Sequence, residues 1–273
     1  MYNNSRFIDP YWGFNPIFMI ILTVSYLDFK GTIIFGNTNI NEKTIVFAIF
    51  SLLLVYGIRH VIIYSRAFKS LSLEDEDFRY VDFRVKFGTK KVLYWIFNYV
   101  FLHIYSIFIE SSLLYPPIHV IEIFTTFSKE SENRYRQSFK LCYLGYFLSI
   151  IGFILETLAD EQLYYFMIKK ENSESKHYNS SVHKDHLVIK AGLWSKIRHP
   201  NYLGEIIYML GLLVINYGVT EKLDITMVLP LIAYFIMFVS YSIPMMEDRL
   251  MKKYRNEYTE YKKNTYRLIP YIY

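Results

Sequence analysis

The sequence predicts an all-α fold, a polytopic integral membrane bundle of about six transmembrane helices, with residues 1–273 forming a single membrane domain. Three observations support this prediction. Apolar residues gather in runs of roughly the 20 residues that a bilayer-crossing helix needs. Tyrosine and tryptophan stand at many ends of these runs, where amphipathic rings meet lipid headgroups. Lysine and arginine concentrate in alternate loops between the runs.

The apolar runs are longer than most helices of soluble proteins, which makes a soluble helical core the less favoured alternative. The last run contains Pro244, and we expect it to end or kink there because proline removes a helical hydrogen bond. In chain order the runs are Tyr11–Phe29, Thr44–Tyr64, Val92–Leu114, Phe139–Leu158, Tyr202–Val219 and Ile225–Pro244.

Loop charge predicts the orientation. With six spans, the second loop, the fourth loop and the tail share one side, and they carry most of the basic residues. The positive-inside rule then puts both termini on the cytoplasmic or matrix side. The net charge of +5 fits loops beside membrane lipids and gives no reason to expect a nucleic-acid partner. We expect the endoplasmic reticulum or the mitochondrial inner membrane as the location.

Two segments differ from the spans. The polar composition of 170–190 predicts a flexible loop insertion, and 245–273 reads as an amphipathic C-terminal tail whose tyrosines mainly pack. The loop holds His177, His183 and His186, but no carboxylate or thiol spacing accompanies them, so we predict no metal site. A single cysteine, Cys142, excludes an intrachain disulfide.

Ionisable residues inside or at the rim of a span are costly and therefore mark candidate sites. Glu156 and Asp160 lie four residues apart and share one helix face. Two carboxylates there repel unless cations or hydroxyls meet them, and ribose hydroxyls are one such partner. A solvated helix end is the alternative.

A second polar stretch contains Arg198, His199 and Pro200. Proline suits the first turn of a helix, and the backbone amides there, with the two basic residues, predict an anion site. Gly204 permits close approach of a ligand or another backbone, and Glu205 follows within the helix. Anchoring of this loop to lipid headgroups is the alternative.

Two further groups complete the candidate chemistry. Glu247 and Arg249 follow Pro244 at the same predicted membrane face as Arg198, as a nucleotide site would require. In the second run a phenol, a guanidinium and an imidazole share one helix face, and a polarised phenol can deliver a proton. Simple packing and a positive helix end are the alternative for this group, which is Tyr56, Arg59 and His60.

Several motifs, in order along nearly the whole chain, resemble the membrane-embedded steroid 5-alpha-reductase family, in its broad DUF1295-type branch, which is related to isoprenylcysteine carboxyl methyltransferases. The matching segments are Asp9–Gly13, Tyr56–Arg59 with Glu76–Tyr80, Ala159–Gln162, Gly192–Trp194 with Arg198–Glu205, and Arg267–Tyr273.

The resemblance implies an all-helical membrane enzyme that binds NADPH and reduces a carbon–carbon double bond conjugated to a ketone in a steroid or lipid-like substrate. Tyr56 aligns with the catalytic tyrosine, and Asp9 stands where an acidic partner is expected. The cofactor-binding residues are then Asp160, Gln162, Arg198, His199, Asn201, Tyr202, Glu205, Glu247 and Arg249.

One departure leaves other functions open. Leu163 stands where this branch commonly has a basic residue, and Lys169 and Lys170 are the candidates to compensate at the 2′-phosphate of NADPH. A non-catalytic, reductase-like subunit of a larger membrane complex, for example in the mitochondrial inner membrane, would fit this change. An isoprenylcysteine-type methyltransferase using S-adenosylmethionine is the other alternative, since it shares the Arg198–Gly204 pattern, whereas Ala159–Gln162 favours the reductase.

Overall fold

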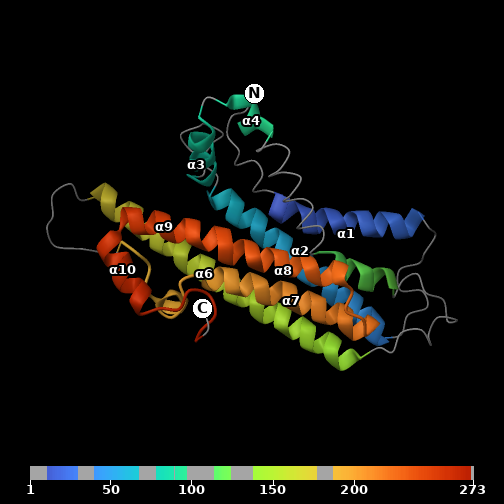
Figure 1. Cartoon of the computed structure of the whole chain (residues 1–273). Helices are drawn as coiled ribbons and strands as arrows, with labels where there is room; N and C mark the ends of the chain where they lie inside the picture. Colours follow the sequence, from blue (N-terminus) through green and yellow to red (C-terminus); the bar gives the residue numbers. More distant parts are fainter. Residues whose placement is uncertain are drawn as a thin grey trace. The chain divides into compact units, whose positions relative to one another are not determined.

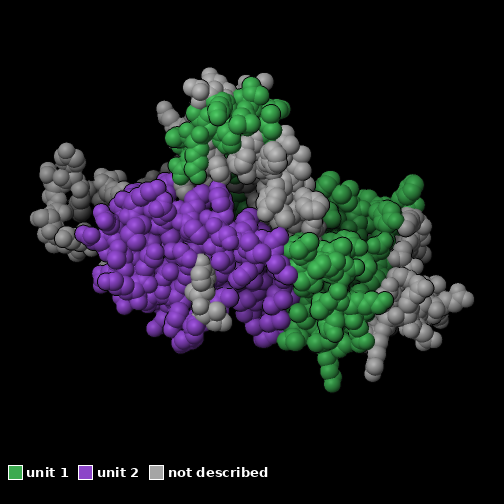
Figure 2. All heavy atoms as spheres, in the orientation of Figure 1, with its two compact units in different colours: residues 1–146, 212–230 green, residues 147–211, 231–273 purple. Residues whose placement is uncertain are grey.

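The computed structural model describes residues 11–29, 40–67, 78–88, 90–96, 114–123, 138–176 and 187–271. Every regular element in these ranges is a helix, as the sequence predicts (Figure 1). The chain divides into two compact units, the first comprising 1–146 with 212–230 and the second 147–211 with 231–273 (Figure 2). The expected single membrane domain stays a prediction.

The first unit is built around two apolar helices, α1 (Tyr11–Phe29) and α2 (Ile40–Ala67). Glycines let the two backbones touch, because a Cβ on Gly57 would lie only 2.8 Å from the carbonyl oxygen of Gly13. The other helices described in this unit's N-terminal portion are α3 (Phe78–Phe87), α4 (Lys91–Trp95) and the helical stretch 114–123.

The second unit contains most of the C-terminal half of the chain, and three of its helices, α6, α7 and α8, also contribute residues to the first unit. Its elements are α6 (Phe139–Lys176), the 3₁₀ turn η4 (Gly192–Ser195), α7 (Pro200–Thr220), α8 (Ile225–Met237), the π-helical turn η5 (Phe238–Ser242), α9 (Ile243–Lys253) and α10 (Arg255–Lys263).

The helix α6 extends to Lys176, into the segment 170–190 for which the sequence predicts a loop. The stretch 171–176 mixes the good helix formers glutamate and lysine with the weaker ones asparagine and serine, so its composition alone does not exclude helix. Residues 177–186, with the three loop histidines, lie outside the described residues.

Within the described ranges, four helices are long and apolar enough to cross a membrane, and Gly13–Phe29 is a shorter apolar helix. Large apolar side chains such as Phe147, Leu158 and Leu229 are exposed on them, as lipid-facing residues are. The chain is therefore a multi-pass membrane protein, although the six spans are not all accounted for because most of Val92–Leu114 lies outside the described residues. The four long spans are Ile40–Arg66, Phe139–Lys170, Pro200–Thr220 and Ile225–Lys253.

The last span does not end at Pro244. It passes from α8 through η5 into α9, and Pro244 lies in the first turn of α9, where a missing N–H is tolerated. The π-helical turn, with its wider hydrogen-bond spacing, is the irregularity at this point of the helix.

Candidate cofactor site

Glycines bring α6 and α7 into backbone contact within the second unit. A Cβ on Gly204 would lie 2.5 Å from the backbone nitrogen of Glu156, and one on Gly152 would lie 2.3 Å from that of Tyr208. Ser149 adds a hydrogen bond, its hydroxyl donating to the Tyr208 carbonyl at 3.1 Å. The sequence predicts a close approach at Gly204, and the structure shows that the α6 backbone is what approaches it. This contact places polar residues of α6 and α7 side by side.

The first such pair is Asp160 on α6 and Asn201 on α7. The Asn201 amide nitrogen donates to Oδ1 of Asp160 at 3.0 Å. The amide oxygen of Asn201 is buried and has no hydrogen-bond partner among the described residues. A buried acceptor without a donor is unfavourable, so this oxygen is a point at which a ligand hydroxyl or N–H would bind.

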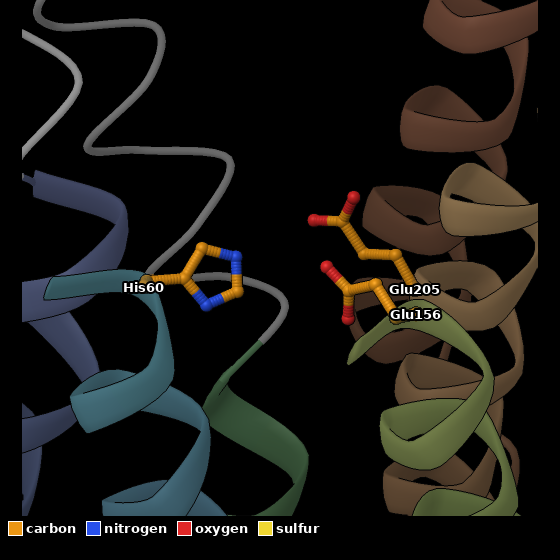
Figure 3. Close-up of side chains that lie close together, drawn as sticks. All are labelled: His60, Glu156 and Glu205. Atoms are coloured by element: carbon orange, nitrogen blue, oxygen red, sulfur yellow. The ribbon is translucent and has the colours of Figure 1, made fainter. Parts of the chain in front are cut away.

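A second pair of side chains, both acidic, lies about one turn away from Asp160 and Asn201 along the same two helices. Glu156 and Glu205 are both buried, and their carboxylate oxygens approach within 4.8 Å (Figure 3). Two charged carboxylates this close repel strongly in a protein interior, so donors or a proton must accompany them. The hydroxyl of Tyr234, on α8, supplies one donor through a short hydrogen bond to Glu205.

Stacked rings cover the start of α7. The Tyr202 ring stacks with those of His199 and Phe238, with centroids 5.5 Å and 4.3 Å away and interplanar angles of 11° and 9°. Phe238 opens the π-helical turn, and its ring also contacts Tyr234 at 4.6 Å. The π turn therefore positions an aromatic side chain at the site, as such turns often do at functional sites.

A buried ion cluster centres on Glu247. Arg198 Nε lies 2.6 Å from Oε1 of this carboxylate, and Arg267 lies 3.0 Å from Oε2. Lys262 is 3.6 Å from Oε2, and His199 Nε2 is 3.5 Å from Oε1. Burial lowers the pKa of His199 below its usual value, and this outweighs the opposing effect of Glu247. The His199 imidazole is accordingly neutral near pH 7.

Arg198 is also tied to the tail. Its Nη1 donates to the Lys262 carbonyl at 3.2 Å and to the Thr265 carbonyl. These contacts, together with the ion pair to Glu247, fix the guanidinium within the fold. The expected contacts of Arg198 and Glu247 with a cofactor stay predictions, and the structure gives both residues a part in holding the loop before α7.

The segment Ala159–Gln162 is fastened to η4. Gln162 Oε1 accepts from the backbone N–H of Leu193 at 3.0 Å, and the Trp194 indole donates to the Ala159 carbonyl at 3.0 Å. Leu163 packs against the apolar cluster that includes Ala159 and Trp194. An apolar contact thus occupies the position at which the family resemblance leads one to expect a basic side chain.

Three predicted residues remain, namely Arg249, Tyr56 and Asp9. Arg249 is exposed on α9. Tyr56 is fully buried on α2, with its ring centroid 4.2 Å from that of His60 (labelled in Figure 3), and both belong to the first unit. Asp9 lies outside the described residues. The catalytic roles of Tyr56 and Asp9 therefore stay predictions.

The sequence analysis did not identify Tyr234 or Phe238 as site residues. A tyrosine inside an apolar span is a usable signal, because its buried hydroxyl needs a hydrogen-bond partner. No comparable pattern distinguishes Phe238, since phenylalanine is frequent throughout the chain. Only the break in helix geometry, which the structure shows, sets it apart.

Residues 1–265 match the family described as protein of unknown function (DUF1295). No curated protein and no solved structure matches the chain.

Proposed function

The chain belongs to the DUF1295 family, and we propose that it is a membrane-embedded, NADPH-dependent reductase of a conjugated carbon–carbon double bond in a steroid or lipid substrate. The observation that carries this proposal is the Asp160–Asn201 pair, whose buried Asn201 amide oxygen has no donor among the described residues. The resemblance of the surrounding motifs to steroid 5-alpha-reductases suggests the cofactor and the reaction.

The residues around this pair suit a dinucleotide. Ribose hydroxyls can donate to the Asn201 oxygen and to the Asp160 carboxylate, which are both acceptors. Glu205, held by Tyr234, adds a further acceptor one helical turn deeper. When bound, NADPH supplies the hydride for one alkene carbon. Tyr56 is the residue expected to deliver the proton to the other carbon.

Calorimetry of the full chain in mild detergent tests the cofactor. We expect NADPH to bind more tightly than S-adenosylmethionine. Asp160→Ala and Asn201→Ala should each weaken NADPH binding roughly ten- to a hundredfold, because each leaves a bound polar group without a partner. Asp248→Ala, which removes an exposed carboxylate paired only with Lys252 among the contacts shown, is the matched control and should bind normally.

Two results would contradict the reductase. Tighter binding of S-adenosylmethionine would favour the methyltransferase that shares the Arg198–Gly204 pattern. Normal NADPH affinity in both Asp160→Ala and Asn201→Ala would show that the pair does not bind this cofactor.

A non-catalytic subunit is the second candidate, and the apolar packing of Leu163 favours it. The deciding assay is single-turnover oxidation of bound NADPH with a panel of enone lipids. Oxidation with any enone supports the enzyme. No oxidation, combined with stable co-purification in a large membrane complex, supports the subunit.

A further inference from the structure

The end of α7 is connected to the helical stretch 114–123 by one buried asparagine. Asn216 is 1% exposed, and its amide nitrogen donates to the Pro116 carbonyl at 2.9 Å. The same nitrogen lies 3.1 Å from Nδ1 of His119. All three residues belong to the first unit, so a single amide group joins two segments that lie far apart in the sequence.

The Pro116 carbonyl determines which atom of Asn216 faces His119. A carbonyl oxygen only accepts, so the Asn216 atom beside it is the NH₂ nitrogen rather than the amide oxygen. The NH₂ group has a second hydrogen for His119, whose Nδ1 must then accept. An accepting Nδ1 requires a neutral imidazole with its proton on Nε2, because a protonated imidazole donates from both nitrogens. The observed contact therefore belongs to the uncharged state of His119.

Two carboxylates favour the charged state of the same ring. Glu122 lies on the same helical stretch, and Asp224 lies between α7 and α8. Burial lowers the pKa of His119 below its usual value, and the opposing attraction of Glu122 and Asp224 has the smaller effect. Hydrogen bonds from the backbone N–H and the hydroxyl of Thr226 hold the pKa of Asp224 below its usual value, so this carboxylate stays charged near neutral pH.

His119 is accessible to protons from water. Its ring is partly exposed, and the neighbouring Tyr115 and Asp224 are exposed, as are Glu221 and Lys222, the other charged residues between α7 and α8. The Tyr115 ring stacks on the imidazole with the centroids 5.6 Å apart. Partial burial and the nearby carboxylates raise the pKa of the Tyr115 hydroxyl, so it stays neutral. His119 is therefore a group whose charge changes between about pH 5 and pH 7.

We propose that His119 is a pH-sensitive switch, which holds the stretch 114–123 against α7 when its imidazole is neutral and releases this contact when the imidazole is protonated. Protonation puts a hydrogen on Nδ1, where it meets the NH₂ group of Asn216. The positive ring is attracted by Glu122 and Asp224 instead. Most apolar residues of the stretch are buried, so the change loosens the stretch without unfolding it.

The switch lies at the end of α7 that is farther from the candidate cofactor site. The candidate membrane span Pro200–Thr220 is this helix, and the cofactor site lies at its start. Asn216 therefore lies near the opposite membrane face. His119 responds to the pH of the compartment on that side, and this response does not depend on the proposed reductase activity.

Hydrogen–deuterium exchange of the full chain in mild detergent tests the switch. The readout is the protection factor of peptides that cover 114–123, which corrects for the pH dependence of chemical exchange, with peptides from 203–211 as the internal reference. The folded-state pKa of His119 is lowered, so the protection is complete above pH 6.5 and is lost as the pH falls towards the lowered value. Between about pH 7.5 and about pH 5 the protection factor should fall roughly two- to tenfold, as expected for one hydrogen bond.

Two variants isolate the imidazole. In His119→Gln the protection of 114–123 should no longer change over this range, because glutamine does not titrate. Tyr115→Phe keeps the stacked ring and the imidazole, so it is the matched control and should show the same fall as the wild type. If His119→Gln fails to fold, Asn216→Ala gives the same test, because protonation of His119 then breaks no hydrogen bond to the amide.

The outcomes are decisive in both directions. A fall in the wild type that His119→Gln or Asn216→Ala abolishes supports the switch. Constant protection in the wild type would overturn it. So would a fall in His119→Gln as large as that in the wild type, which would assign the pH dependence to another group such as Glu122.

Discussion

The substitution Gly204→Ala tests whether the contact between α6 and α7 positions the candidate cofactor site. The added Cβ would lie 2.5 Å from the Glu156 backbone nitrogen and 2.7 Å from the Gly152 carbonyl oxygen. Both atoms belong to backbone, so no side-chain rotation relieves the clash. Ordinary contact begins at 3.4 Å, so the helices must separate locally by about 0.9 Å.

This separation has two expected effects. Overpacking of this kind typically lowers the free energy of unfolding by about 1–3 kcal/mol. Asn201 lies one turn before Gly204, and a comparable displacement from Asp160 would stretch their 3.0 Å hydrogen bond beyond ~3.5 Å, where it is lost. We therefore expect NADPH affinity to fall roughly tenfold in addition to the loss of stability.

Gly218→Ala is the matched control. Its Cβ would meet the backbone nitrogen and Sγ of Cys142 at 2.9 Å, so it also overpacks α7 against α6, but about 21 Å along the helix from Gly204. Both variants gain the same helix propensity from alanine, so that contribution cancels in the comparison. Denaturant unfolding and NADPH titration of both proteins decide the matter. Equal NADPH affinity in the two variants would refute the idea that this contact positions the site.

Three further predictions concern single side chains. Glu247→Ala should lower the free energy of unfolding by about 3–5 kcal/mol, because Arg198 would keep a buried charge without its carboxylate partner. Asp248→Ala removes an exposed carboxylate and is the control. Equal denaturant midpoints for these two variants would contradict a stabilising role of the Glu247 cluster. Burial raises the pKa of Glu257, but the hydrogen bond from Leu187 N–H and the ion pair with Lys190 outweigh it and hold that pKa below the usual 4.5. These two interactions therefore stabilise the fold above pH 4.5, and their contribution is lost as the pH falls through the lowered pKa of Glu257. Unfolding measured from pH 6 to pH 3 should therefore show a loss of stability that Glu257→Gln reduces, and identical pH profiles would exclude this contribution. Tyr56→Phe should leave NADPH affinity nearly unchanged and slow turnover by about 10²–10⁴-fold if the phenol delivers the proton; unchanged turnover would remove it from the mechanism.

Much of the fold can be predicted from the sequence, because the length of an apolar run indicates whether a helix can span a membrane. The runs at Thr44–Tyr64 and Tyr202–Val219 lie within α2 and α7. At 170–176 the polar composition predicts a loop, whereas the structure continues α6 to Lys176. At Pro244 the sequence predicts an end or a kink, and the structure excludes the end, because α9 continues beyond the proline after a π turn.

The candidate site was only partly predictable, and for a different reason. Spacing on one helix shows that Glu156 and Asp160 share a face, but it cannot show which residue of another helix meets them. That pairing depends on Gly152 and Gly204, whose joint effect appears only when two backbones are seen in contact. The hydrogen bond from Asn201 to Asp160 follows from that contact and was not foreseen.

The residues of the Arg198–Glu205 motif divide into two groups by what they contact. The tail holds the beginning of the motif, where Arg198 N–H donates to the Tyr266 carbonyl at 2.8 Å. It also holds η4 just before the motif, where the Tyr261 hydroxyl donates to the Trp194 carbonyl at 2.6 Å. With Glu247 against its guanidinium, Arg198 acts within this framework as a fixed part of the loop.

Asn201 and Glu205 form the other group, because their side chains meet α6 and α8 rather than the tail. A loop fixed by the tail presents these two residues in one geometry, which lowers the entropy that a ligand must overcome on binding. The tail is therefore expected to affect ligand affinity through the loop that it holds. Arg267, which pairs with Glu247 at 3.0 Å, is the residue through which that effect would reach the motif.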